Sequence, residues 1–160
     1  MDRNASTVQL LDALKQTPLR FQAASREVPD ERLGMAGGKG EWSANEILWH
    51  IRAAADVYGE HIARMLDEEA PGWRHVSPRA RMKKVRYKEL PFSDSLAAFE
   101  DQRAQLVARL ESLAPAAWQR FAIIRVEKKD HRLMLRERVW GMASHESVHC
   151  DQVEAVLAPQ

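Results

Sequence analysis

The stretch SANEILWHIRAAADVYGEHIARMLDEE, residues 43–69, is a long amphipathic segment. It opens on a capping box, because Ser43 is followed three residues later by Glu46 where the apolar pattern starts. Its apolar side chains recur at helical spacing and form one stripe, which comprises Ile47, Ile51, Ala54, Tyr58, Ile62 and Met65. Pro71 and Gly72 then end the pattern. The stretch therefore predicts a long helix that buries one of its faces.

Other segments of the chain show the same helical period. They are residues 6–24, 93–113 and 136–157. Pro18 lies inside the first of these and predicts that this helix is kinked or divided. Residues 121–135 contain two β-favouring runs around a polar turn at residues 127–130, which predicts a short β-hairpin before the last helix. Because residues 73–90 show no clean period, we expect an all-α four-helix bundle with a kinked first helix and a long crossover.

Length and composition place the chain among ordinary globular proteins. Its 160 residues favour one domain spanning residues 1–160, and 45% apolar with 29% charged residues is typical of such domains. The net charge of +1 gives no field that favours nucleic acid or membrane. With Cys150 as its only cysteine and no apolar leader at the N-terminus, the chain is expected to be cytoplasmic.

The string HESVH, residues 145–149, is the strongest chemical signal. Two histidines at i and i+4 lie about 6 Å apart on one helix face, so both imidazoles can reach one cation. The string is also the zinc signature of metalloproteases, in which the Glu acts as general base. However, residues 149–160 lack the glycine and third histidine of a metzincin and leave no room for a further ligand helix. The sequence therefore excludes the metzincins and also the thermolysin-like enzymes, whose third ligand comes from a later helix. A third protein ligand must lie upstream.

Two upstream histidines belong to the helix predicted for residues 43–69. His50 and His61 both lie on or beside its apolar stripe, but about 16 Å of helix separates them, so they cannot share one ion. His145 and His149 likewise fall on the inner stripe of the last helix. Either these buried imidazoles bond to neighbours in the core, or three of them hold one divalent cation with an open position for water. Periodicity alone leaves both interpretations open.

Two runs, EWSANEILWHI at residues 41–51 and HESVHCDQ at residues 145–152, resemble the DinB superfamily of metal-dependent enzymes. In that superfamily a W-[ST]-x-x-E-x-x-x-H segment on the second helix supplies one ligand, and an H-x-x-x-H pair on the last helix supplies two. The resemblance implies that His50, His145 and His149 bind one divalent ion, either nickel or zinc, with iron or manganese as alternatives. It also implies a four-helix bundle, often as a homodimer, and some relatives are thiol-dependent S-transferases or isomerases.

Three polar residues have candidate roles beside these ligands. Glu146 is the candidate catalytic base that would activate water, but it lies about 100° around the helix from His145, so it can instead face a neighbouring helix or solvent. Gln152 shares the ligand face one turn further on, where it can bond to a ligand or a substrate. Glu46, one turn before His50, can orient that imidazole, although its capping role already explains it.

Residues 73–88 are strongly basic. They contain seven Lys or Arg residues and no acid, namely Arg74, Arg79, Arg81, Lys83, Lys84, Arg86 and Lys88. This segment can attract an anionic substrate or nucleic acid, or it can be a solvated loop balanced by the acidic residues 67–69 before it. Because the overall charge is balanced and no nucleic-acid-binding motif is recognised, the sequence favours the solvated loop and no nucleic-acid partner.

Two functions from different classes follow. The first is a divalent-metal-dependent enzyme, of the hydrolase or thiol-dependent S-transferase type, acting on a small-molecule substrate. In the transferase form an external low-molecular-weight thiol is required, since Cys150 points away from the ligand face. The alternative is a non-enzymatic, metal-stabilised stress-response or binding protein whose ion is structural.

Overall fold

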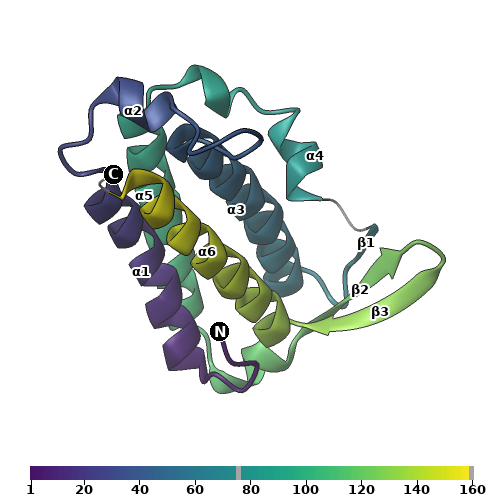
Figure 1. Cartoon of the computed structure of the whole chain (residues 1–160). Helices are drawn as coiled ribbons and strands as arrows, with labels where there is room; N and C mark the ends of the chain where they lie inside the picture. Colours follow the sequence, from purple (N-terminus) through teal and green to yellow (C-terminus); the bar gives the residue numbers. More distant parts are fainter. Residues whose placement is uncertain (75–76, 159–160) are drawn as a thin grey trace.

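Four long helices dominate the computed structural model, which describes residues 1–74 and 77–158. They are α1 Thr7–Ser25, α3 Ala44–Asp67, α5 Phe92–Glu111 and α6 Leu135–Leu157 (Figure 1). Each begins and ends within about two residues of its predicted boundaries. The predicted four-helix bundle is therefore confirmed.

Local side-chain signals explain where these helices start. The Ser43 hydroxyl accepts a hydrogen bond from the backbone N–H of Glu46 at 3.2 Å, and the Glu46 carboxylate accepts one from the Ser43 N–H at 2.9 Å. Ser6 and Gln9 form the equivalent capping box at α1. Such reciprocal bonds satisfy the free N–H groups of a first helical turn. Within α1 the chain continues through Pro18, so the predicted division of this helix is wrong.

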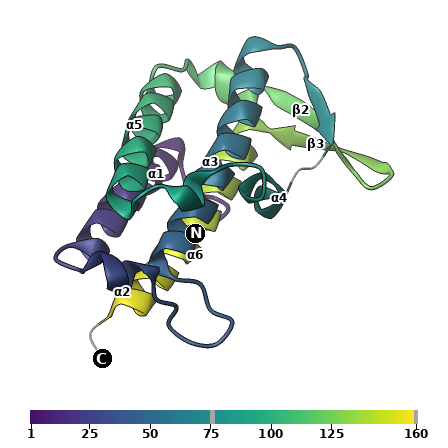
Figure 2. The same ribbon diagram turned by 90° about the horizontal axis from the view of Figure 1, so that it is seen from above.

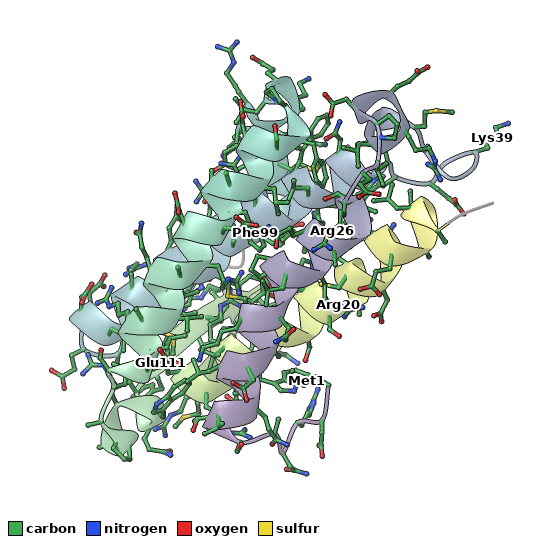
Figure 3. All side chains as sticks on the ribbon, turned by 90° about the vertical axis from the view of Figure 1, so that its left-hand side faces the viewer. Met1, Arg20, Arg26, Lys39, Phe99 and Glu111 are labelled. Carbon is green, nitrogen blue, oxygen red and sulfur yellow. The ribbon has the colours of Figure 1, made fainter. Side chains whose placement is uncertain are left out.

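The four helices pack as a ring in which α6 lies between α1 and α3, and α5 contacts the same two helices from the other side (Figures 1 and 2). Apolar side chains fill the centre, where Phe21 on α1 meets Phe99 on α5 edge to face at 6.4 Å. On the outer surface, Arg20 extends from α1 toward α6 and pairs with Glu154 (Figure 3). Among the described residues, no helix is both long and apolar enough to cross a membrane.

The long crossover between α3 and α5 contains short elements that the sequence did not predict. These are β1 Gly72–Arg74, the helix α4 Pro78–Met82 and the 3₁₀ helix Tyr87–Glu89. A further short helix, α2 Asp30–Gly34, precedes α3. Segments of three to five residues are too short to show a hydrophobic period. α4 packs against α3 (Figure 2) and so brings the basic segment onto the bundle.

The predicted hairpin is confirmed as β2 Phe121–Val126 and β3 Lys129–Met134, which pair antiparallel. Its turn is tighter than predicted, because Glu127 adopts a positive φ of 54° and Asp130 already lies in β3. There Asp130 pairs with Arg125 across the hairpin at 2.7 Å. β1 adds to β2 in parallel and completes a three-stranded sheet. The sheet projects from the end of the bundle at which α6 begins (Figure 1).

Candidate metal centre

Three imidazoles meet between α3 and α6. The ring of His50 lies 5.0 Å from that of His145 and 4.7 Å from that of His149, and the two α6 rings are 4.7 Å apart. One nitrogen of each ring lies within 4.8 Å of the others, and the Nε2 atoms of His50 and His145 are 3.0 Å apart. Because zinc–nitrogen bonds are about 2.0–2.1 Å long, two donors on one ion lie at most about 4.2 Å apart. The Nε2 atoms of His50 and His145 lie within this limit, and the 4.8 Å bound on the whole set exceeds it by about 0.6 Å, so small ring rotations would bring all three donors onto one ion.

Burial keeps these imidazoles in the form that binds metals. It lowers the pKa of His50 to about 3 and that of His145 to about 4, with a further contribution from the neighbouring imidazoles. The pKa of His149 is also lowered, chiefly by burial. A neutral imidazole presents a free lone pair, and protonation would remove it. The Nδ1 atoms of His50 and His145 are buried and have no hydrogen-bond partner within the described residues.

Gln152 bonds to one of these imidazoles. Its Oε1 lies 2.9 Å from Nδ1 of His149, and since an amide oxygen only accepts, Nδ1 donates and Nε2 retains its lone pair. Gln152 also lines a surface cavity of about 370 Å³ together with Arg32 of α2 and Glu41 of the loop before α3. Gln152 thus links a candidate ligand to an open cavity.

Glu46 serves the helix start instead. Its carboxylate accepts hydrogen bonds from the backbone N–H and the hydroxyl of Ser43, at 2.9 and 3.3 Å. These contacts hold the first turn of α3, and with it the position of His50 one turn later. The influence of Glu46 on the cluster therefore passes through the backbone.

Aromatic rings wall the three imidazoles. Trp42, which immediately precedes the α3 cap, stacks on His149 with ring centroids 6.0 Å apart and an interplanar angle of 15°. The same indole lies 4.9 Å from the ring of His50. On the other side, Tyr58 of α3 lies 6.1 Å from His145. Apolar ring faces exclude water from the cluster without competing for its lone pairs.

The remaining histidines lie outside this cluster. His61, also on α3, is buried against Trp73, with stacked rings 4.2 Å apart, and the guanidinium of Arg138 bonds to its Nδ1. His131 lies exposed on β3. His75 falls outside the described residues. Of the two histidines of α3, the structure thus brings only His50 to the α6 pair.

Glu146, the predicted catalytic base, does not join the imidazole cluster. Its carboxylate is fully buried and accepts a hydrogen bond from Arg103 of α5 at 2.5 Å and one from the Thr17 hydroxyl of α1 at 3.0 Å. Successive helical residues differ by about 100° in direction, and α6 lies between α1 and α3. Glu146 therefore points into the opposite interface from its histidine neighbours.

Arg103 is a buried partner that the sequence reasoning missed. It is 2% exposed and occupies the middle of the buried stripe of α5, which includes Leu96, Phe99, Val107 and Leu110. An arginine at the spacing of an apolar stripe is the signal that could have identified it, because a buried cation requires an anion nearby.

Cys150 is a buried thiol, as expected. Its Sγ faces the backbone carbonyl of Thr17 at 4.0 Å, on the α1 side of α6. Burial raises the pKa of the Cys150 thiol to about 12, so it stays protonated at neutral pH. It offers neither a metal ligand nor a nucleophile.

Comparison with known proteins agrees with this architecture. The family model described as the DinB superfamily matches residues 13–153, which is most of the chain. The chain belongs to the DinB superfamily. The resemblance noted in the sequence is thereby confirmed, and a search of curated proteins returned no match.

Among solved structures, this DinB-superfamily chain is similar to YfiT from Bacillus subtilis. The two share 18% sequence identity with a TM-score of 0.73, over 98% of this chain and 90% of that one. YfiT is described as a probable metal-dependent hydrolase with an unusual four-helix bundle topology. At this identity the likeness establishes the shared fold alone.

Next to the three imidazoles lies a cation that the sequence reasoning did not connect with them. The guanidinium carbon of Arg79, on α4, lies 5.2 Å from the centroid of the Trp42 ring. Arg79 belongs to the basic segment, which the sequence analysis interpreted as a solvated loop. Its contact depends on how the crossover folds back onto α3, so no local pattern could have revealed it.

Proposed function

We propose that this protein is a divalent-metal-dependent enzyme in which His50, His145 and His149 hold one ion. One observation carries the proposal: three neutral imidazoles, one of them buried and two partly buried, converge, and among the described residues no carboxylate or thiol completes the set. Structural zinc sites usually close with four protein ligands, whereas catalytic sites keep one position open. The three-histidine set therefore favours a catalytic ion over the alternative of a metal-stabilised binding protein.

The bound ion would supply Lewis-acid chemistry, polarising a substrate oxygen and lowering the pKa of water. The protein's own residues orient a ligand and exclude water. Gln152 fixes the tautomer of His149, while Trp42 and Tyr58 limit the access of bulk water. We assign Glu146 a structural role, since Arg103 and Thr17 already occupy its carboxylate.

We favour a hydrolase acting on a small-molecule substrate, in line with the description of YfiT. Imidazole donors suit zinc and nickel, with iron or manganese as alternatives. The ligand set therefore does not determine which metal binds, and metal analysis is required. A thiol-dependent S-transferase is the second candidate. In that case the thiol would come from a separate small molecule, because Cys150 is buried and protonated.

Metal analysis of matched variants tests the proposal. The untagged protein, loaded with zinc or nickel and dialysed, is expected to retain one equivalent by elemental analysis. His50→Ala is expected to lose it, while His61→Ala, which removes a buried imidazole from the same helix, is expected to keep it. Full retention by His50→Ala would remove that residue from the site.

A second measurement separates the enzyme from the binding protein. Cobalt-loaded protein is titrated with azide, and its visible spectrum is expected to shift if an exchangeable position exists. Release of p-nitrophenol from a panel of activated esters is then compared between the metal-loaded protein and His50→Ala. If azide left the cobalt spectrum unchanged and the metal-loaded protein had no esterase activity, the ion would have no exchangeable coordination position, which would favour a structural ion.

A further inference from the structure

Two arginines flank the imidazole cluster, and each reaches it through an aromatic ring. On one side, the Arg79 guanidinium lies 5.2 Å from the ring of Trp42, which stacks on His149. On the other side, Arg138 of α6 lies 4.3 Å from the ring of Tyr58, which faces His145. The two cations come from different elements, the crossover helix α4 and the bundle helix α6.

Neither arginine is neutralised by a carboxylate within the described part of the chain. The contact of Arg79 there is the indole ring, and its side chain is exposed. Arg138 donates to His61, and its Nε is buried without a hydrogen-bond partner. Other basic residues of the crossover differ, since Arg81 pairs with Glu60 of α3.

The carboxylates of α3 and α6 that lie near the cluster in sequence are engaged elsewhere, and Asp151, two residues after His149, pairs with Arg20. Glu46 bonds to the Ser43 cap, and Glu146 bonds to Arg103 and Thr17. Asp56 accepts from the Tyr87 hydroxyl at 2.7 Å and from the Gln102 amide at 2.9 Å. The uncompensated positive charge is therefore local to Arg79 and Arg138, since Glu41 lines the cavity beside Gln152 and forms no ion pair among the described residues; a bound divalent ion would increase this positive charge.

We infer that the site takes a small anionic substrate, bearing a carboxylate or phosphoryl group, and that Arg79 recognises this group. A guanidinium binds such oxyanions with two parallel hydrogen bonds, and Arg79, which lies over the Trp42 ring and forms no ion pair among the described residues, has its N–H groups available to do so. Arg138 adds fixed positive charge from behind Tyr58. The inference rests on the proposed function, because it names the substrate class of the same site.

The test is calorimetric titration of zinc-loaded and metal-free protein with benzoate, methylphosphonate and the neutral control benzamide. Wild-type protein is expected to bind at least one anion and to bind benzamide at least about tenfold more weakly. Arg79→Gln is expected to weaken anion binding at least about tenfold, while Arg79→Lys keeps part of the affinity. The matched control is Arg74→Gln, which removes the same charge from an exposed position of the same basic segment.

The outcomes separate this inference from the proposed function. Equal losses in Arg79→Gln and Arg74→Gln, or no anion binding by protein that has taken up zinc, would overturn the inference and leave the metal site standing. If the protein takes up no metal but still binds anions in an Arg79-dependent way, the proposed function fails and the recognition site remains. Preference for methylphosphonate over benzoate would assign the phosphoryl group, and the reverse would assign the carboxylate.

Discussion

The two faces of α6 carry buried polar clusters of opposite character. Toward α1 and α5, Glu146 accepts from Arg103 and Thr17, so its charge is balanced within the protein. Toward α3, three imidazoles converge, and two of them have buried Nδ1 atoms without a partner in the described part of the chain. The first cluster pairs opposite charges within the protein, although Nε and Nη1 of Arg103 also have no hydrogen-bond partner among the described residues, whereas the second brings together three imidazoles with no opposite charge among them. We therefore propose that adjacent residues of one HExxH string serve stability on one side of α6 and metal binding on the other.

The largest effect is expected at the interface of α6 with α1 and α5, where Glu146 pairs with Arg103. Glu146→Ala leaves the Arg103 cation buried and unpaired, which should lower the free energy of unfolding by about 3–5 kcal/mol. The control is Glu154→Ala on the same helix, where loss of the exposed pair with Arg20 should cost less than about 1 kcal/mol. Urea denaturation of metal-free protein measures both. Equal stabilities for the two variants would contradict the structural role of Glu146.

At the imidazole cluster, which faces α3, a change in stability is expected only when metal is present. A metal concentration 100 times the Kd should stabilise the wild-type protein by about 2.7 kcal/mol. His145→Ala should lose this increment, whereas Glu146→Gln should keep it, because its side chain faces the other interface. Denaturation with zinc and with a chelator gives the difference. If Glu146→Gln lost the increment while remaining folded, the separation of the two faces would be wrong.

Removing the support of one imidazole should have a smaller effect. Gln152→Leu deletes the acceptor for Nδ1 of His149 and should weaken metal binding about 10- to 100-fold. Gln152→Glu keeps an acceptor at the same place and is expected to retain most of the affinity. Competition with a chromophoric chelator measures both dissociation constants. No change in Gln152→Leu would mean that the hydrogen bond does not orient a ligand.

Counted per imidazole and per pH unit, the smallest effect is a pH dependence of the metal-free protein. The folded pKa values of His50 and His145, about 3 and about 4, lie below the ordinary 6.5, so the unfolded chain takes up protons first as the pH falls. The free energy of unfolding should therefore decrease below pH 6.5 toward pH 4, by up to about 1.4 kcal/mol per pH unit for each imidazole. His50→Asn should reduce this slope. A slope unchanged in His50→Asn would show that other groups cause it.

Much of the fold could be predicted because its signals are local. The capping box at Ser43 and the 3.6-residue period located α3, and the β-favouring runs located the hairpin. The strand β1 could not be predicted in this way. It has only three residues, and its partner β2 lies about fifty residues further along the chain, so its pairing depends on the folded bundle.

The candidate site likewise has parts that local sequence signals could predict and parts that depend on how the helices pack. Helical phase placed His50, His145 and His149 on inward faces, but phase alone could not say which helix Glu146 would meet. That depends on the ring order of the helices, which puts Arg103 opposite Glu146 from a position 43 residues earlier. The contact of Arg79 with Trp42 is likewise set by the path of the crossover.

The candidate ligands lie far apart along the chain. His50 and His145 are separated by 95 residues, and α6 is the last helix of the described chain. An ion held by both would act as a removable cross-link, restricting the unfolded ensemble in the way that a disulfide across a loop of that length does. It would form only after the last helix has docked, so metal occupancy would mark chains that have completed folding.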